Sequence, residues 1–203
     1  MKVNALVVLA TFVWAGAASA NLLTNPGFST EGTGGAQDAA DWTETSNCGR
    51  ETWGSHDGDG YLMAQYGWNA QTSDQFYQDV TGATEGYTYS LSFWHEGDSG
   101  WNGTAVSASL VWLDSEGSSI GTPATVDLQP YFAESWSNRT LSGVAPSGTA
   151  TVRVQFDATK PDGGSGSQKF DELDLVAIPE PTAMSLLGFT IAGLMSLRRR
   201  RHS

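Results

Sequence analysis

The chain has 203 residues and a formal net charge of −12 at pH 7. The negative charge is concentrated between Asn21 and Ile178, where 21 acidic residues stand against five basic ones, a net charge of −16. A surface of this sign repels nucleic acid and anionic lipid, so nucleic acid is not expected as a partner. The same region is long enough to form one domain with a hydrophobic core of its own.

The first twenty residues have the three parts of a secretory signal peptide. Lys2 supplies a positive start, the stretch 5–15 is apolar, and Ala18-Ser19-Ala20 is a cleavage site of the small-x-small type. A retained N-terminal anchor is the alternative. We expect cleavage, so that the mature chain begins at Asn21 on the far side of a membrane.

Between the two ends, apolar and polar residues alternate in short runs separated by glycine-rich turns, which is typical of β-strands. No stretch keeps a helical period. About nine strands with connections of hairpin length favour an all-β fold of two packed antiparallel sheets. The strands are predicted at residues 22–23, 40–45, 61–66, 75–80, 87–94, 105–113, 135–141, 149–157 and 170–176.

Seven tryptophans lie within this domain, and aromatic rings can cover the flat C–H faces of sugars. Those in strand contexts are expected in the core, and those in glycine-rich loops or on the outward face of a strand are expected to reach solvent. The first group is Trp42, Trp112 and Trp136, and the second is Trp53, Trp68, Trp94 and Trp101. With Arg153 and Gln155, which alternate outward on the strand 149–157, the second group predicts a shallow groove that binds polysaccharide. The alternative is that the loop tryptophans fold back as plugs over the ends of the sandwich.

Residues suited to catalysis are sparse. Cys48 is the only cysteine, so no disulfide can form within the chain, and no base stands beside it. His95, Glu96 and Asp98 suggest a base next to carboxylates, but they also fit the end of a strand. With 21 acidic residues in the domain, the sequence cannot single out a carboxylate pair for glycoside hydrolysis. We therefore predict that the protein is not an enzyme.

The last segment, Ile178–Ser203, combines three features. Pro179-Glu180-Pro181 interrupts regular structure, residues 182–197 form an uncharged, mostly apolar run, and four arginines follow. A helix of this run would be about 24 Å long, short of a hydrocarbon core of about 30 Å, and arginine stems can cover the difference. The pattern predicts a single transmembrane helix with the arginines on the cytoplasmic side. An ordinary tail anchor or an amphipathic end helix is the alternative.

This order of features is similar to the PEP-CTERM sorting tail of Gram-negative bacteria. The resemblance implies export, transient anchoring in the inner membrane, and recognition by an exosortase that is thought to cut near the Pro-Glu-Pro. It also implies a final place at the cell surface or in the extracellular matrix. The sorting residues are Pro179, Glu180, Pro181, Arg198, Arg199, Arg200 and Arg201.

Short segments spread along the domain carry a second resemblance. They are residues 21–28 (Asn-Leu-Leu-Thr-Asn-Pro-Gly-Phe), 41–42, 76–80, 87–93, 113–117, 136, 145–148 and 170–173. In this order they resemble galactose-binding-like jelly rolls, the fold of several carbohydrate-binding modules. Many such modules hold a structural calcium near the first and last strands, and here Glu31 and Asp171 would be its ligands, because calcium prefers oxygen donors. The sequence departs from the family pattern at Ser29, where an acidic residue is usual.

The sequence therefore predicts a signal peptide at 1–20, an antiparallel jelly-roll sandwich at 21–177 and a sorting tail with a transmembrane helix at 178–203. The expected function is polysaccharide binding by an exported, non-catalytic domain. A structural surface or matrix protein without a ligand site is the first alternative, and a secreted hydrolase is the second.

Overall fold

The computed structural model describes residues 20–45, 47–67, 73–131, 133–161 and 164–180. The predicted signal peptide, Trp68 and the sorting tail from Pro181 onward, with its four arginines, lie outside these residues. Among the residues that are described, no helix is long and apolar enough to cross a membrane.

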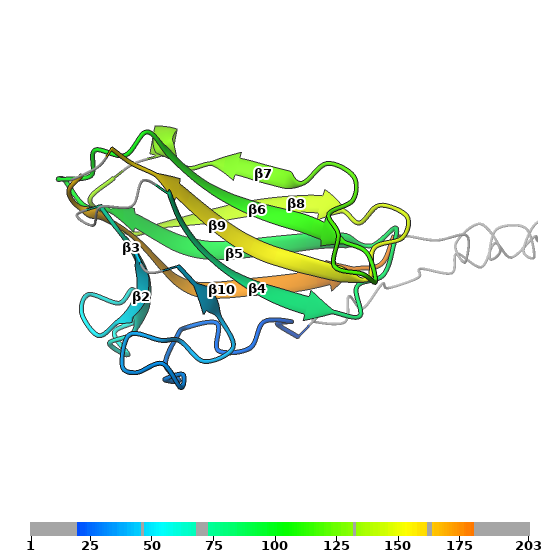
Figure 1. The fold of residues 1–203 in the computed structure, drawn as a ribbon, viewed down its shortest axis with the longest axis horizontal. Helices are drawn as coiled ribbons and strands as arrows, with labels where there is room; N and C mark the ends of the chain where they lie inside the picture. Colours follow the sequence, from blue (N-terminus) through cyan, green and yellow to red (C-terminus); the bar gives the residue numbers. More distant parts are fainter. Residues whose placement is uncertain (1–19, 46, 68–72, 132, 162–163, 181–203) are drawn as a thin grey trace, which may run out of the picture.

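The described residues form two five-stranded sheets in which all paired strands are antiparallel. The β9 sheet has the strand order β1 (Thr43–Glu44), β4 (Ser73–Thr81), β9 (Thr151–Thr159), β6 (Ala105–Leu113) and β7 (Ala124–Asp127). The β10 sheet has the order β2 (Cys48–Glu51), β3 (Leu62–Tyr66), β10 (Ser167–Ile178), β5 (Thr88–Gly97) and β8 (Ser137–Val144). A short 3-10 helix, η1 (Gln129–Tyr131), precedes β8. Figure 1 looks onto the β9 sheet with the β10 sheet behind it, and the predicted two-sheet sandwich is confirmed.

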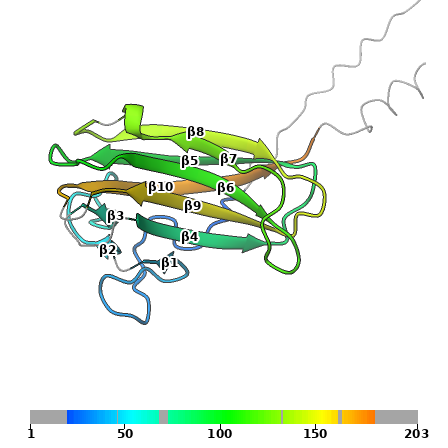
Figure 2. The ribbon, with the colours of Figure 1, turned by 45° about the horizontal axis from the view of Figure 1, so that its top comes forward.

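The strands with the clearest alternation form where the sequence predicts them. Strand β6 covers the predicted 105–113 residue for residue. Strands β2 and β7 were not predicted, because β2 contains Gly49 and Arg50 and β7 has no buried residue to mark it. The expected strand at 22–23 is wrong, although the Leu22 N–H donates to the Leu175 carbonyl at 2.8 Å. Figure 2 shows the short β1 at the lower edge of the β9 sheet.

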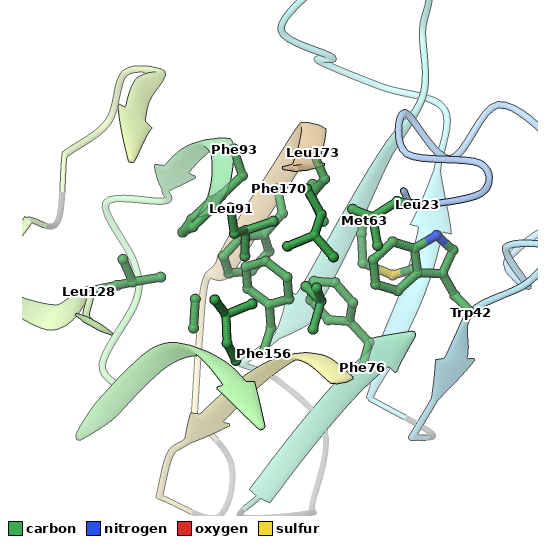
Figure 3. Packing of buried hydrophobic residues seen from close by; sticks show 14 of the residues in the cluster. Leu23, Trp42, Met63, Phe76, Leu91, Phe93, Leu128, Phe156, Phe170 and Leu173 are labelled. Carbon is green, nitrogen blue, oxygen red and sulfur yellow. The ribbon is translucent and has the colours of Figure 1, made fainter. Parts of the chain in front are cut away.

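Alternation along the strands builds the core between the sheets. Phe76 and Phe156 of the β9 sheet and Phe93 and Phe170 of the β10 sheet are all fully buried (Figure 3). The rings of Phe76 and Phe156 stack with centroids 4.6 Å apart and an interplanar angle of 6°. Phe93 meets Phe156 edge-on at 5.1 Å. These contacts fix the spacing of the two sheets, so the outward residues of each sheet lie on opposite sides of the molecule.

Strand β10 contains a bulge between Asp171 and Asp174, where its register against β5 shifts. Glu172, within the bulge, has a φ of +48°, a conformation that non-glycine residues rarely adopt. The extra residue allows Phe170 and Leu173 to point into the core although they are three residues apart. The bulge also joins β10 to the first loop, because the Leu173 N–H donates to the Pro26 carbonyl at 3.1 Å.

Candidate functional site

The predicted ligand residues do not form one groove. Arg153 and Gln155 point outward from β9, whereas Trp94 points outward from β5 in the other sheet. Trp53 lies in the β2–β3 loop, on the same side as Trp94. The structure therefore offers two separate candidate surfaces, the outer face of the β9 sheet and the outer face of the β10 sheet.

Trp101 does not reach solvent as predicted, because its side chain belongs to the core cluster and is only 9% exposed. A Cβ atom added at Gly103 would lie 2.1 Å from the Trp101 ring, so a glycine is required there for the indole to pack. Trp101 is a plug at one end of the sandwich. Trp42 and Trp112 are buried as predicted, but Trp136 lies outside the main core.

The outer face of the β9 sheet, called the open face below, carries polar side chains in rows across the strands. Strand register places four side chains in one row and four in the next. The first row is Tyr77, Gln155, Ser109 and Thr125, and the second is Gln75, Asp157, Ser107 and Asp127. In Figure 1 no described segment crosses in front of the middle of β9 and β6. The open face therefore presents the exposed Thr125 and Asp127 and several half-buried amide, hydroxyl and carboxylate groups to solvent. Ser109 is the exception, because it is only 6% exposed and its hydroxyl lies 2.9 Å from that of Thr125.

Hydrogen bonds fix the side chains of the open face in defined orientations. The Arg153 guanidinium binds both oxygens of Asp79, at 2.7 and 2.9 Å, and its central carbon lies 3.9 Å from the centre of the Tyr77 ring. The amide nitrogens of Gln75 and Gln155 both donate to Asp157, at 2.9 Å and 2.8 Å. Their amide oxygens are thereby turned away from Asp157. Oriented acceptors beside one aromatic ring can bind the hydroxyls and the C–H face of a sugar.

The outer face of the β10 sheet, called the aromatic face below, gathers three tryptophans and a histidine. The His56 ring stacks on Trp94 at a centroid distance of 3.7 Å and an angle of 15°, and Trp136 meets His56 edge-on at 5.8 Å. Trp136 also packs on a small cluster formed by Leu62, Ala64 and Tyr66. Because protein atoms cover much of these two indoles, Trp53 is the tryptophan of this face that is most exposed, at 41%.

The β2–β3 loop is held on the aromatic face by two acidic residues of the β10 bulge. The buried Asp171 carboxylate accepts the backbone N–H groups of His56, at 2.8 Å, and of Glu172, at 2.7 Å. The Glu172 carboxylate contacts Nδ1 of His56. Burial raises the pKa of Asp171 to about 6, although the two N–H donors favour its charged form. Asp171 thus holds the loop in place.

The two predicted calcium ligands lie in different surroundings, because Asp171 is buried and Glu31 is exposed. Both oxygens of Asp171 are engaged by N–H donors, Glu31 is exposed, and the described residues contain no group of three or more His, Cys, Asp or Glu that could hold a metal. Three carbonyls of the first loop instead receive the guanidinium of Arg50. Calcium binding stays a prediction, and a melting temperature that falls on chelation would support it.

The histidine and carboxylates considered for catalysis are divided between two environments. His95 points into the core, where its Nε2 lies 2.7 Å from the Gln168 side-chain oxygen, and burial lowers its pKa to about 4. Glu96 and Asp98 point to the aromatic face and bind Lys169 at 2.7 and 2.8 Å. The suggested pair of a base and a carboxylate does not form.

No protein-family model matches the chain, and no curated protein sequence matches it. Several solved structures share its fold. The enzymatically active domain of tailspike protein 4 of bacteriophage CBA120 has a TM-score of 0.60 at 16% identity, over 78% of this chain and 21% of that one. The carbohydrate-binding module TmCBM61, solved with β-1,4-galactotriose, has a TM-score of 0.55 at 17% identity, over 77% of this chain and 98% of the module. A cyclase from Fischerella sp. TAU has a TM-score of 0.57 at 13% identity, over 82% of this chain and all of the cyclase.

At such low identity the likeness concerns the fold alone. The chain spans about a fifth of the tailspike domain but nearly the whole of the carbohydrate-binding module. Other carbohydrate-binding modules share the fold as well. The domain is therefore a β-sandwich of the kind found in carbohydrate-binding modules. A protein named as a cyclase has the same fold, so the fold by itself does not determine function.

Proposed function

We propose that residues 21–177 form an exported, non-catalytic domain that binds polysaccharide across the open face. The observation that carries this proposal is the row of four outward side chains from Tyr77 to Thr125, set by the register of β4, β9, β6 and β7. Four strands at the usual spacing place the ends of the row about 14 Å apart. A site of this length suits a chain of several sugars, with one sugar ring against the side of Tyr77 that Arg153 leaves uncovered and the polar groups binding hydroxyls.

The side chains of the open face are held in fixed orientations, which supports the proposal. Binding costs less when the binding groups are already held in position, and the bidentate Arg153–Asp79 pair and the two amides on Asp157 provide this.

One observation favours the alternative of a structural protein without a ligand site. Trp101 is a plug, and much of Trp94 is covered by His56, so two of the predicted ligand tryptophans have roles within the protein.

The first test is substitution on the open face. We expect Tyr77→Ala and Gln155→Ala each to weaken polysaccharide binding several-fold, because an aromatic contact or a hydrogen bond contributes about 0.5 to 1.5 kcal/mol. Binding would be measured by glycan array and then by affinity electrophoresis with residues 21–178. Thr125→Ala on β7 should weaken binding in the same way, and Thr140→Ala, at an exposed outward residue of β8 on the other sheet, is its control. If the open-face variants bind as well as the unchanged domain, the ligand is not on this face.

We also propose that the C-terminal tail directs the protein through an exosortase to the cell surface or extracellular matrix. The support is the order of Pro179-Glu180-Pro181, the uncharged run 182–197 and the four arginines in the sequence. Deletion of residues 179–203 should release the domain into the periplasm or medium, as measured by fractionation and immunoblotting. Replacement of the four arginines by serine tests the cytoplasmic end separately. Retention of the truncated protein at the surface in undiminished amount would exclude the tail as the determinant.

A further inference from the structure

We propose that the aromatic face carries a second, weaker carbohydrate contact centred on Trp53, so that one domain can cross-link two polysaccharide chains. This rests on the proposed function of the open face and adds a second attachment on the opposite side of the sandwich. The contact consists of the Trp53 indole and the charged groups of Lys169, Glu96 and Asp98 around it.

Trp53 is exposed and held in place at the same time. The residue is 41% exposed, and the Lys169 ammonium lies over one face of its ring, 5.2 Å from the ring centre. The loop that carries it is fixed by the His56 N–H on Asp171 and by the Gly60 N–H on the Ser55 hydroxyl, both at 2.8 Å. A ring that is presented to solvent on an ordered loop can stack on a sugar with little loss of conformational freedom.

The groups beside Trp53 have the hydrogen-bonding chemistry that sugar hydroxyls need. Lys169 is buried at 9% exposure and bridges Glu96 and Asp98, so its ammonium fixes the two carboxylates, which are the acceptors left for a ligand. The side chains of Glu96 and Asp98 are 18% and 32% exposed, which leaves part of each carboxylate accessible. An exposed indole face beside such a cluster suits a polyhydroxylated, uncharged ligand better than an anionic one.

The contact is weaker than the open face because one largely free ring and two partly exposed carboxylates stand against two rows of polar side chains there. His56 covers Trp94, and Trp136 packs on the Leu62, Ala64 and Tyr66 cluster. A single stacked ring with a few hydrogen bonds gives weak binding by itself. Once the open face holds a polysaccharide, however, neighbouring chains are present at high local concentration, and a weak second contact becomes effective.

The two contacts cannot serve a single straight stretch of polysaccharide. The open face belongs to the β9 sheet and Trp53 lies over the β10 sheet, with the phenylalanine core between them (Figure 3). Packed sheets are separated by about 10 Å, and outward side chains add to this distance. A domain bound through both faces therefore joins two chain segments.

The experiment compares binding with cross-linking for matched variants of the domain in its monomeric state, which gel filtration verifies. Soluble polysaccharides, beginning with a β-1,4-linked galactan and a xylan, serve as probes in affinity electrophoresis for binding and in light scattering for cross-linking. We expect the unchanged domain to bind and to increase scattering. Trp53→Ala should keep binding within about twofold and return scattering to the baseline of the polysaccharide alone.

The double variant Tyr77→Ala, Gln155→Ala separates the two faces. We expect it to keep a weak retardation in the gel that Trp53→Ala then abolishes. If Trp53→Ala cross-links as well as the unchanged domain, or if the double variant shows no binding that depends on Trp53, the second contact is overturned while the open face stands. If binding survives the double variant undiminished, the open face fails instead. Absence of binding to every polysaccharide tested removes both proposals.

Discussion

Replacing Arg50 with methionine is expected to lower the free energy of unfolding by about 3 to 5 kcal/mol, a large part of the stability of an ordinary domain. The Arg50 side chain is buried at 5% exposure. Its guanidinium donates to the carbonyls of Phe28 at 2.7 Å, Ala36 at 2.8 Å and Ser29 at 3.1 Å. Methionine has a similar length but no donor, so three carbonyls of the first loop would lose their partner.

The size of this effect follows from the surroundings of Arg50. Among the described residues it has no salt bridge, and its charge is stabilised by the three carbonyls and by the ring of Tyr61, 4.3 Å away. The Phe28 carbonyl is buried, and a buried carbonyl left without a donor costs about 1 to 3 kcal/mol, whereas the carbonyls of the exposed Ser29 and Ala36 lose less. Arg50→Lys keeps the charge but cannot span three acceptors with the same planar group, so we expect an intermediate loss.

Arg153→Met is the matched control, because Arg153 is a half-buried surface residue paired with Asp79. We expect it to cost about 1 kcal/mol or less. Guanidinium chloride unfolding followed by tryptophan fluorescence measures all three variants, and an unchanged slope of free energy against denaturant shows that they unfold alike. Equal losses for Arg50→Met and Arg153→Met would mean that the carbonyl cluster does not hold the first loop.

Trp101→Ala is expected to destabilise the domain by about 3 to 5 kcal/mol and to leave polysaccharide binding by the folded fraction unchanged. The indole is 9% exposed and belongs to the main core cluster, so its removal leaves a cavity at one end of the sandwich. Thermal unfolding and affinity electrophoresis, carried out below the melting temperature of the variant, give the two quantities separately.

Trp53→Ala is the companion measurement, since Trp53 was placed with Trp101 among the predicted ligand residues but is 41% exposed. We expect its loss of stability to stay near 1 kcal/mol or below, as for most surface substitutions. The pair therefore tests whether burial or sequence context decides the role of a loop tryptophan. Comparable destabilisation by both substitutions would make Trp53 a second plug and would leave the structural alternative as the better account of the domain.

The sandwich could be predicted because its central strands carry a regular signal. In β5 the inward residues from Tyr89 to Phe93 and the outward Trp94 follow the predicted alternation. The short strands could not be found in this way. Strand β2 has a buried arginine in place of an apolar residue, and β7 pairs with β6 while only Ala124 and Val126 pack, half-buried, against the core.

The candidate site was predicted in its residue types but not in its arrangement. Sequence alternation shows that Arg153 and Trp94 both point outward, but it does not show that their strands belong to different sheets. Tyr77 carried the same signal, as an outward residue of a predicted strand, and could have been included. His56 and Lys169 could not, because their contacts with Trp94 and Trp53 depend on how the β2–β3 loop folds over the sheet.

The bulge in β10 shifts the alternation of inward and outward side chains by one residue. Up to Phe170 the inward side chains have even numbers, and from Leu173 onward they have odd numbers. Deleting Glu172 would restore a single phase without moving any apolar residue out of the core. The same deletion would remove the partner of His56 and shift the Leu173 N–H that binds Pro26. Glu172 is thus not needed for the pairing of β10 with its neighbouring strands. Its role is to attach the first loop and the β2–β3 loop, both far from β10 in the sequence, to this last strand of the domain.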